Sequence, residues 1–305
     1  MEPLTKVKQL LRHYWHVNTI KGTDSRRELC ASARRLLHRN NFLVRHHVAR
    51  DCRHKAGFQI PAEQGFKIFK PGHFAEADDV VRAARSLISK TDPDNSIWSR
   101  PQIKPDSLNM GELTLESPYL RFAMRADILT SISAYLGVVP VLAYVGVWYS
   151  RDSHKKIEGS QLFHCDWDDI TQVKIFVHCS DIDIASGPLV LLEANKSAAA
   201  RASLNYKYGD RHCRVPDEKM EAVVGINDRH PIVGPVGTVA FVDSSRCFHY
   251  GSRVDGATRR RILAAFQFVT PSAFLLPLNY RKGAPFIHLG TGNMSTLERL
   301  VLGAE

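Results

Sequence analysis

The chain has 305 residues, of which 44% are hydrophobic and 24% charged, and its formal net charge is +10. This length is sufficient for one large domain with a substantial core, and the composition excludes a disordered or fibrous protein. No apolar stretch approaches the length of a membrane span and the first residues lack the apolar run of a signal peptide, so we expect a cytoplasmic protein.

Positive charge is concentrated in the first 55 residues, which hold thirteen Lys and Arg against four Asp and Glu. Within this region, residues 24–39 have the spacing of an amphipathic helix. The predicted inner face carries apolar residues: Leu29, Ala33, Leu36 and Leu37. The predicted solvent face carries arginines: Arg26, Arg27, Arg34 and Arg35. A solvated helix face explains this basic charge better than a nucleic-acid-binding arm does.

A short strand is predicted at Phe42-Leu43-Val44 with Val48, after a stop at Asn40-Asn41. Turn residues follow, then a helix over 75–88 and a loop over 90–111 that is a candidate lid. Residues 120–136 are predicted to form one helix, which Gly137 ends and Pro140 prevents from continuing. Further along, the pattern changes to short strands separated by turns, which is typical of a sandwich or barrel. These strands are predicted at 141–149, 173–179, 189–192, 231–233, 238–242 and 261–268, with a last short helix near 296–300.

The chemistry is expected at His164-Cys165-Asp166, because a histidine and a carboxylate two positions apart on an extended chain project from the same face. A third ligand is available at His249, which follows an apolar strand. Two histidines and one carboxylate on one face of an octahedral ion leave three positions open, which is the arrangement that non-haem Fe(II) oxygenases use. An arginine could then hold the far carboxylate of a dicarboxylic co-substrate.

This ordered set, together with the Asp-x-Asp-x-x-x-Gly turn at residues 181–187 and an arginine about eleven positions after His249, resembles the phytanoyl-CoA dioxygenase-like (PhyH) family. The resemblance implies an α+β fold built on a double-stranded β-helix, a jelly-roll or cupin-like barrel with N-terminal and flanking helices. It implies one domain over 1–305, with a mainly helical part at 1–140, the barrel at 141–270 and a tail at 271–305.

The resemblance also implies Fe(II), 2-oxoglutarate and O2 as cofactors, with His164, Asp166 and His249 as the catalytic metal ligands. The implied reaction hydroxylates a C–H bond of a small organic substrate and releases succinate and CO2. Residues 193–196 and 253–256 depart from the family pattern, so its substrates are not transferred. A basic protein favours an anionic substrate, although the basic region lies away from the proposed iron.

Among three adjacent arginines, the spacing from His249 favours Arg260 as the 2-oxoglutarate anchor. Arg260 shares strand parity with Ile262, Ala264, Phe266 and Phe268, whereas Arg259 and Arg261 fall on the other face, and Arg259 is the second choice. Four further residues are predicted to surround the ligands or the co-substrate. They are Lys174, Phe176, Gln161 and Ser252.

Two alternatives remain open. A cupin-type isomerase would keep the fold and a divalent metal but would not depend on 2-oxoglutarate or on Arg260. A non-catalytic barrel with a basic nucleic-acid-binding arm would bind DNA or RNA in a strongly salt-dependent way and would be indifferent to changes at His164 or Asp166. The second alternative gives no reason for the ordered ligand set.

Overall fold

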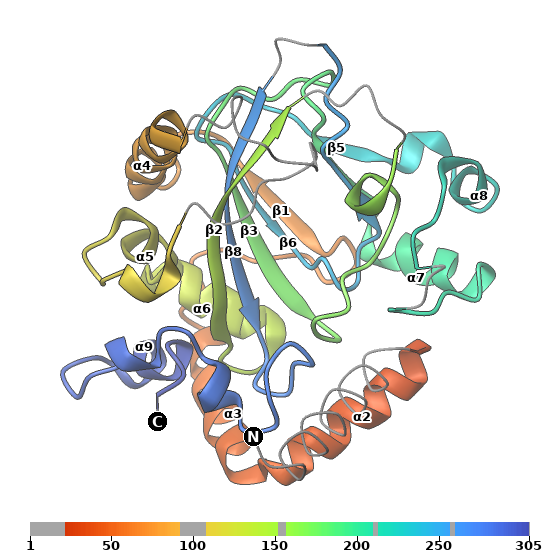
Figure 1. The fold of residues 1–305 in the computed structure, drawn as a ribbon. Helices are drawn as coiled ribbons and strands as arrows, with labels where there is room; N and C mark the ends of the chain where they lie inside the picture. Colours follow the sequence, from red (N-terminus) through yellow and green to blue (C-terminus); the bar gives the residue numbers. More distant parts are fainter. Residues whose placement is uncertain (1–21, 92–107, 152–156, 210–212, 257–259, 305) are drawn as a thin grey trace, which may run out of the picture.

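Two antiparallel sheets form the centre of the protein in the computed structural model, which describes residues 22–91, 108–151, 157–209, 213–256 and 260–304 (Figure 1). The larger sheet has the strand order β1-β6-β3-β8-β2 and the smaller one the order β5-β4-β7. The strands are β1 Phe66–Phe69, β2 Val141–Arg151, β3 Gln172–His178, β4 Leu189–Leu191, β5 His230–Ile232, β6 Val239–Val242, β7 His249–Tyr250 and β8 Arg260–Val269. The predicted change from helices to antiparallel strands near residue 141 is confirmed, whereas β1 was not predicted.

Alternation along β3 shows how the large sheet is buried on both faces. Val173, Ile175 and Val177 join a core that also contains residues of the helices, while Phe176 joins a second core with residues of β4 and β5. Because neighbouring strand residues point to opposite faces, one face of the sheet packs on helices and the other on the small sheet. In Figure 1 the helices α4, α5 and α6 lie along one side of the large sheet. The predicted sites lie on the opposite side, between the sheets.

Eight α-helices are found in the described residues: α2 Asp24–Leu37, α3 Arg39–Arg53, α4 Glu76–Thr91, α5 Pro118–Ala123, α6 Ala126–Leu136, α7 Ala194–Ser203, α8 Asp217–Glu221 and α9 Thr296–Val301. The single helix predicted at 120–136 is therefore two. Arg125 has an extended backbone (φ −56°, ψ 136°) and its guanidinium binds Asp127 and Glu76, which fixes the break. Gly137 ends α6 in the left-handed conformation (φ 68°), as predicted. Most of the predicted lid, residues 92–107, lies outside the described residues.

The strand predicted at Phe42-Leu43-Val44 is wrong, because these residues belong to α3. The helix is tied down by Arg45, which is fully buried and donates hydrogen bonds to the carbonyls of Val139, Pro140 and Leu300. In a strand, Arg45 and Asn41 would lie on the same face but about 13 Å apart, whereas in the helix they are one turn apart and Nε of Arg45 donates to Oδ1 of Asn41 at 3.1 Å. Tertiary hydrogen bonds thus override the β-propensity of a short apolar run.

The predicted orientation of α2 is also wrong. Leu29, Leu36 and Leu37 are 72%, 73% and 69% exposed, whereas Arg27 and Arg34 are buried. Arg27 donates to the carbonyls of Trp167 and Asp169, and Arg34 donates to those of Leu276 and Pro277. The helix therefore faces the loops with its arginines, which supply donors that those carbonyls lack. In the described part of the chain, no helix combines the length and the apolar character needed to cross a membrane.

Candidate metal centre

Two segments far apart in the sequence bring the predicted ligands together. His164 and His249 form an antiparallel bridge with reciprocal backbone N–H···O hydrogen bonds of 2.9 Å. The amide of Asp166 donates to the carbonyl of Ser244 at 2.8 Å, which fixes the carboxylate close to the bridge. One ligand atom from each of the three residues lies within 4.8 Å of the others. The three side chains therefore converge on one point and could hold a divalent metal ion.

Backbone carbonyls set the tautomer of both histidines. Nδ1 of His164 lies 2.8 Å from the carbonyl oxygen of Leu162, and Nδ1 of His249 lies 3.0 Å from that of Cys247. A carbonyl oxygen only accepts hydrogen bonds, so each Nδ1 carries the proton and each Nε2 keeps its lone pair. Burial lowers the pKa of both imidazoles, for His164 with the added effect of neighbouring His249. Both rings are thus neutral and ready to coordinate through Nε2.

The carboxylate of Asp166 has different partners on its two oxygens. Oδ1 lies 3.8 Å from Nε2 of His164 and 3.8 Å from Nε2 of His249, whereas Oδ2 lies 2.7 Å from Nζ of Lys174. Burial alone would raise the pKa of Asp166, but the Lys174 ammonium, together with His249 and His164, outweighs it and lowers the pKa. Burial would lower the pKa of Lys174, and Asp166 with Asp168 raises it instead. Asp166 is therefore ionised, with Oδ1 directed to the histidines and Oδ2 held by the lysine.

The three ligands line a cavity of about 200 Å³ between the sheets. Three of the residues predicted around the co-substrate also line it, namely Lys174, Phe176 and Ser252. Gln161 does not line it but donates from Nε2 to the carbonyl of Ser252 at 2.8 Å. Ser252 has a positive φ of 62°, which is uncommon for a residue other than glycine, and this hydrogen bond holds it there. The other lining residues are Trp148, Ser160, Leu189, Arg214, Gly251, Arg261 and Leu263.

The structure places Arg261 at the cavity, and Arg260 is not among the lining residues. The predicted division of β8 into two faces is correct, but the choice of face is not. Phe266 and Phe268 belong to the core on the helix side of the sheet, so the face they share with Arg260 points away from the metal centre. Arg261 shares its face with Leu263 and Ala265, which face the small sheet. Arg259, the second choice, lies outside the described residues.

Arg261 is a buried cation without an anionic partner. It is 3% exposed, and its guanidinium donates to the carbonyl of Gly187 at 2.6 Å and to the hydroxyls of Ser150 and Ser252. Its Nε is buried without a hydrogen-bond partner. In the described segments no carboxylate lies within ion-pair distance of it, and burial lowers the pKa of Arg261 to about 10. An anionic ligand would stabilise a charge placed in this way.

Arg214 is a second cation of the cavity. Its guanidinium lies 5.6 Å from the centre of the Trp167 ring, and its Nη1 is buried without a hydrogen-bond partner. Its charge contributes to lowering the pKa of His164 and of His249, which places it close to the metal centre. No sequence signal distinguished it, because a lone arginine between cysteine and valine matches no spacing rule.

The neighbours of the ligands in sequence take supporting roles. Asp168 accepts a hydrogen bond from Nε2 of Gln267 at 2.8 Å, and Asp169 accepts from the amides of Ile170 and Thr270. Burial raises the pKa of Asp169 to about 7 and that of the Cys165 thiol to about 12. None of these side chains belongs to the group of converging ligand atoms.

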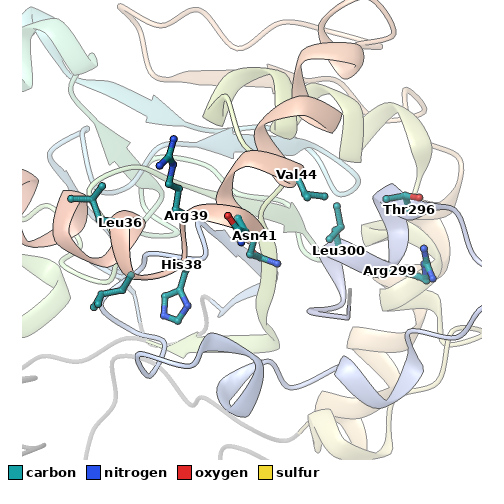
Figure 2. A pocket seen from close by; sticks show the side chains of 10 residues that line it. Leu36, His38, Arg39, Asn41, Val44, Thr296, Arg299 and Leu300 are labelled. Carbon is teal, nitrogen blue, oxygen red and sulfur yellow. The ribbon is translucent and has the colours of Figure 1, made fainter.

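A larger hollow of about 750 Å³ lies elsewhere, between the junction of α2 with α3 and the helix α9 (Figure 2). Its lining includes Leu36, His38, Val44, Thr296 and Leu300, as Figure 2 shows. It contains no member of the metal-binding group. Size alone therefore does not identify the site, which is defined by its converging ligand atoms.

No protein-family model and no curated protein matches the chain. Several solved structures are similar to it in part. EctD from S. alaskensis in its apo form is 18% identical with a TM-score of 0.48, over 69% of this chain and 74% of that one. HygX from Streptomyces hygroscopicus with nickel and 2-oxoglutarate bound is 14% identical with a TM-score of 0.43, over 68% and 83%. The epimerase SnoN in complex with Fe3+, alpha ketoglutarate and nogalamycin RO is 13% identical with a TM-score of 0.46, over 69% and 81%. At such identities the function of this chain has to be argued from its own residues.

Proposed function

We propose that the protein is an Fe(II)- and 2-oxoglutarate-dependent oxygenase that hydroxylates a C–H bond of a small organic substrate and releases succinate and CO2. The observation that carries the proposal is the combination within one cavity of a His-Asp-His group and the buried Arg261 without a counter-ion. A metal ion and a dicarboxylate together would satisfy both features. A non-catalytic barrel would need neither the His-Asp-His group nor a buried arginine without a counter-ion.

The donor set fits Fe(II). Two neutral imidazoles and one carboxylate oxygen leave part of the coordination sphere open for a bidentate co-substrate and O2. No cysteine sulfur of the described residues is among the converging ligand atoms, so a sulfur-rich zinc site is disfavoured. When bound, the iron would supply the redox chemistry that couples O2 to decarboxylation of 2-oxoglutarate. The chain's part is to hold, orient and neutralise the reactants.

Arg261 is the residue that would hold the distal carboxylate of 2-oxoglutarate. Its guanidinium is fixed by Gly187, Ser150 and Ser252, so little side-chain entropy is lost when an anion binds. The hydroxyl of Ser252 lies beside it and can donate to the same carboxylate. Phe176 also lines the cavity, and Lys174 keeps Asp166 ionised and turned toward the histidines.

We also propose the finer features of the fold on this basis. Two antiparallel sheets that pack face to face, with the ligands between them, support a double-stranded β-helix within one domain over residues 1–305. Membership of the phytanoyl-CoA dioxygenase-like family rests on the ordered His164, Asp166, His249 and a following arginine. With Arg261 in that role, the arginine lies one position later than the sequence suggested.

The test is an anaerobic titration of the metal-free protein with Fe(II) and then 2-oxoglutarate, followed by visible absorption. The parent should give a metal-to-ligand charge-transfer band, and Asp166→Ala should give none because one ligand is lost. Asp168→Ala, two positions along, is the matched control and should keep the band. If the parent binds Fe(II) but gives no band with 2-oxoglutarate, the proposal is wrong and a metal-dependent isomerase becomes the better reading.

A further inference from the structure

We infer that Arg214 binds an anionic group of the primary substrate, so that the substrate is a small carboxylic acid. This inference rests on the proposed function, because it assumes that Arg261 and the metal take the two carboxylates of 2-oxoglutarate. It starts from charges that the proposed co-substrate leaves uncompensated.

The charged residues of the cavity are three cations and one anion. Lys174, Arg214 and Arg261 face it, against Asp166 alone. Lys174 is paired with Asp166 at 2.7 Å. The distal carboxylate of 2-oxoglutarate would compensate Arg261, and its other carboxylate would bind at the metal. Arg214 then remains as a partly buried cation for which the described residues supply no anion, which is unfavourable unless a further ligand supplies one.

The position of Arg214 is fixed by the backbone on its C-terminal side. Val215 forms an antiparallel bridge with Phe163, with N–H···O distances of 3.1 and 2.8 Å, so Arg214 lies beside the strand segment that ends at His164. Its guanidinium packs over the Trp167 ring. Its charge acts to lower the pKa of His164, His249 and Lys174. A group bound by Arg214 would therefore be held next to the metal centre.

Arg253 shows what a structural arginine looks like in the same neighbourhood. Its two terminal nitrogens each lie 2.7 Å from a carboxylate oxygen of Asp217, its Nε donates to the carbonyl of Gln161, and it packs over Tyr250. Arg214 has no such carboxylate among the described residues, and its buried Nη1 has no partner. A guanidinium presents its donors in a fixed fork, so the open Nη1 of Arg214 suits a carboxylate oxygen.

The apolar residues that line the cavity indicate what the rest of the substrate, apart from its carboxylate, is like. Trp148, Phe176, Leu189 and Leu263 are the large apolar residues of the cavity, whose volume is about 200 Å³. A cavity of about 200 Å³ is below the usual size of ligand sites, roughly 300 to 1,000 Å³, and must also hold the co-substrate. The substrate is therefore a short acid with an apolar chain or ring, oriented by its carboxylate.

The experiment measures binding without turnover. The protein is loaded with Ni(II) and saturating 2-oxoglutarate, and acetate, propanoate and butanoate are compared with acetamide, propanamide and butanamide by calorimetry and by the Arg Nε–H resonances in NMR. We expect the acids to bind and the neutral amides not to bind. Arg214→Gln should weaken acid binding about tenfold or more, and Arg214→Lys, which keeps the charge, should weaken it less. Arg82→Gln, which removes one exposed charge on α4, is the control for net charge.

Three results would overturn the inference: no carboxylate binds more tightly than its amide, acid binding survives in Arg214→Gln, or this variant loses 2-oxoglutarate affinity instead. The last result would assign Arg214 to the co-substrate. Failure of the proposed function is recognised separately, because the parent would then show no 2-oxoglutarate-dependent charge-transfer band with Fe(II), whatever Arg214 does. Circular dichroism and the unfolding midpoint of each variant show that the fold is retained.

Discussion

Buried arginines occur in two regions of this molecule, and the two groups have different partners. In the helical region, Arg27, Arg34 and Arg45 donate to backbone carbonyls of loops and helix ends. In the cavity, Arg261 and Arg214 each keep a buried nitrogen without a hydrogen-bond partner, and neither has a carboxylate of the described residues beside it. Desolvation is unfavourable for both groups. In the first group, the carbonyls that accept hydrogen bonds from the guanidinium offset it.

We propose that this difference distinguishes structural arginines from ligand-binding ones. A carbonyl oxygen carries only a partial charge, so several of them are needed around one guanidinium, as Arg45 shows with its three carbonyls. Arg261 has one carbonyl and two hydroxyls as acceptors and keeps a buried Nε without a partner, so a carboxylate from a ligand would add the full negative charge that these acceptors lack. We therefore expect substitutions in the first group to affect stability and those in the second to affect binding.

The largest expected effect is on stability, at Arg45. In Arg45→Met, the buried carbonyls of Val139, Pro140 and Leu300 lose their donors, and we expect the free energy of unfolding to fall by about 3 to 5 kcal/mol. Urea unfolding measures this change. Arg82→Met, at a side chain that is 71% exposed, is the control and should stay within about 0.5 kcal/mol. A loss below about 1 kcal/mol in Arg45→Met would contradict the claim that the buried arginines of the helical region stabilise the fold.

The next effect is on co-substrate binding, at Arg261. Arg261→Met should weaken 2-oxoglutarate binding about 10- to 100-fold, since one charge-assisted pair is lost, while unfolding changes by only about 1 kcal/mol. Fe(II)-dependent calorimetry with 2-oxoglutarate measures the affinity. Arg260→Met is a closely matched control, because it removes the same charge from the neighbouring position on the opposite face of β8. Should Arg260→Met be the variant that loses affinity, Arg261 would be a structural arginine after all.

These arginines also show how far the sequence could predict the site. His164, Asp166 and His249 were found because a strand period of two and a short family pattern fix their positions locally. Arg260 was preferred over Arg261 because parity divides β8 into two faces without saying which face meets the helices. That choice depends on the packing of Phe266 and Phe268 against distant segments, which no local pattern records.

The fold was predictable to a similar extent. Turn residues delimit β2 to β6 and β8, and Gly137 ends α6 as expected, whereas β1 and the two-residue β7 were not predicted. The orientation of α2 could not be predicted, because hydrophobic periodicity assumes that leucines face inward. Arg27 faces inward instead, since carbonyls of Trp167 and Asp169 need its donors. The position of Arg214 at the cavity could not be predicted either. It depends on tertiary contacts that leave its Nη1 buried without a partner, and no local pattern in the sequence records them.

A smaller effect is expected on metal binding, at Lys174. In Lys174→Met, Oδ2 of Asp166 loses its ammonium partner. Burial then raises the pKa of the carboxyl, so that a proton competes with the metal for it. We expect Fe(II) affinity to fall about tenfold, as for other partners of metal ligands, and to fall further at acidic pH. Anaerobic competition with a chelator measures it, with the partly exposed Lys196→Met as the control. A rise in affinity would mean that repulsion between the ammonium and the metal outweighs its role in holding Asp166.

The smallest expected effect is the pH dependence of stability at His178. This histidine is buried like the arginines, but it is neutral and therefore needs no anion. His178 is 2% exposed, its Nδ1 has no partner, and burial, with Arg261 adding to it, lowers its pKa to about 4. Because the unfolded chain has the ordinary histidine pKa, it takes up a proton as the pH falls through about 6.5 while the folded chain does not, so stability falls with pH in this window.

We expect this histidine to cost about 1 kcal/mol between about pH 6.5 and 5.5, measured as the difference in unfolding free energy between the parent and His178→Gln. The difference should shrink in an Arg261→Met background, because one of the two causes is removed. It should also shrink when 2-oxoglutarate is bound, if its carboxylate compensates Arg261. An unchanged difference in both cases would show that Arg261 does not act on His178, and would leave burial as the sole cause.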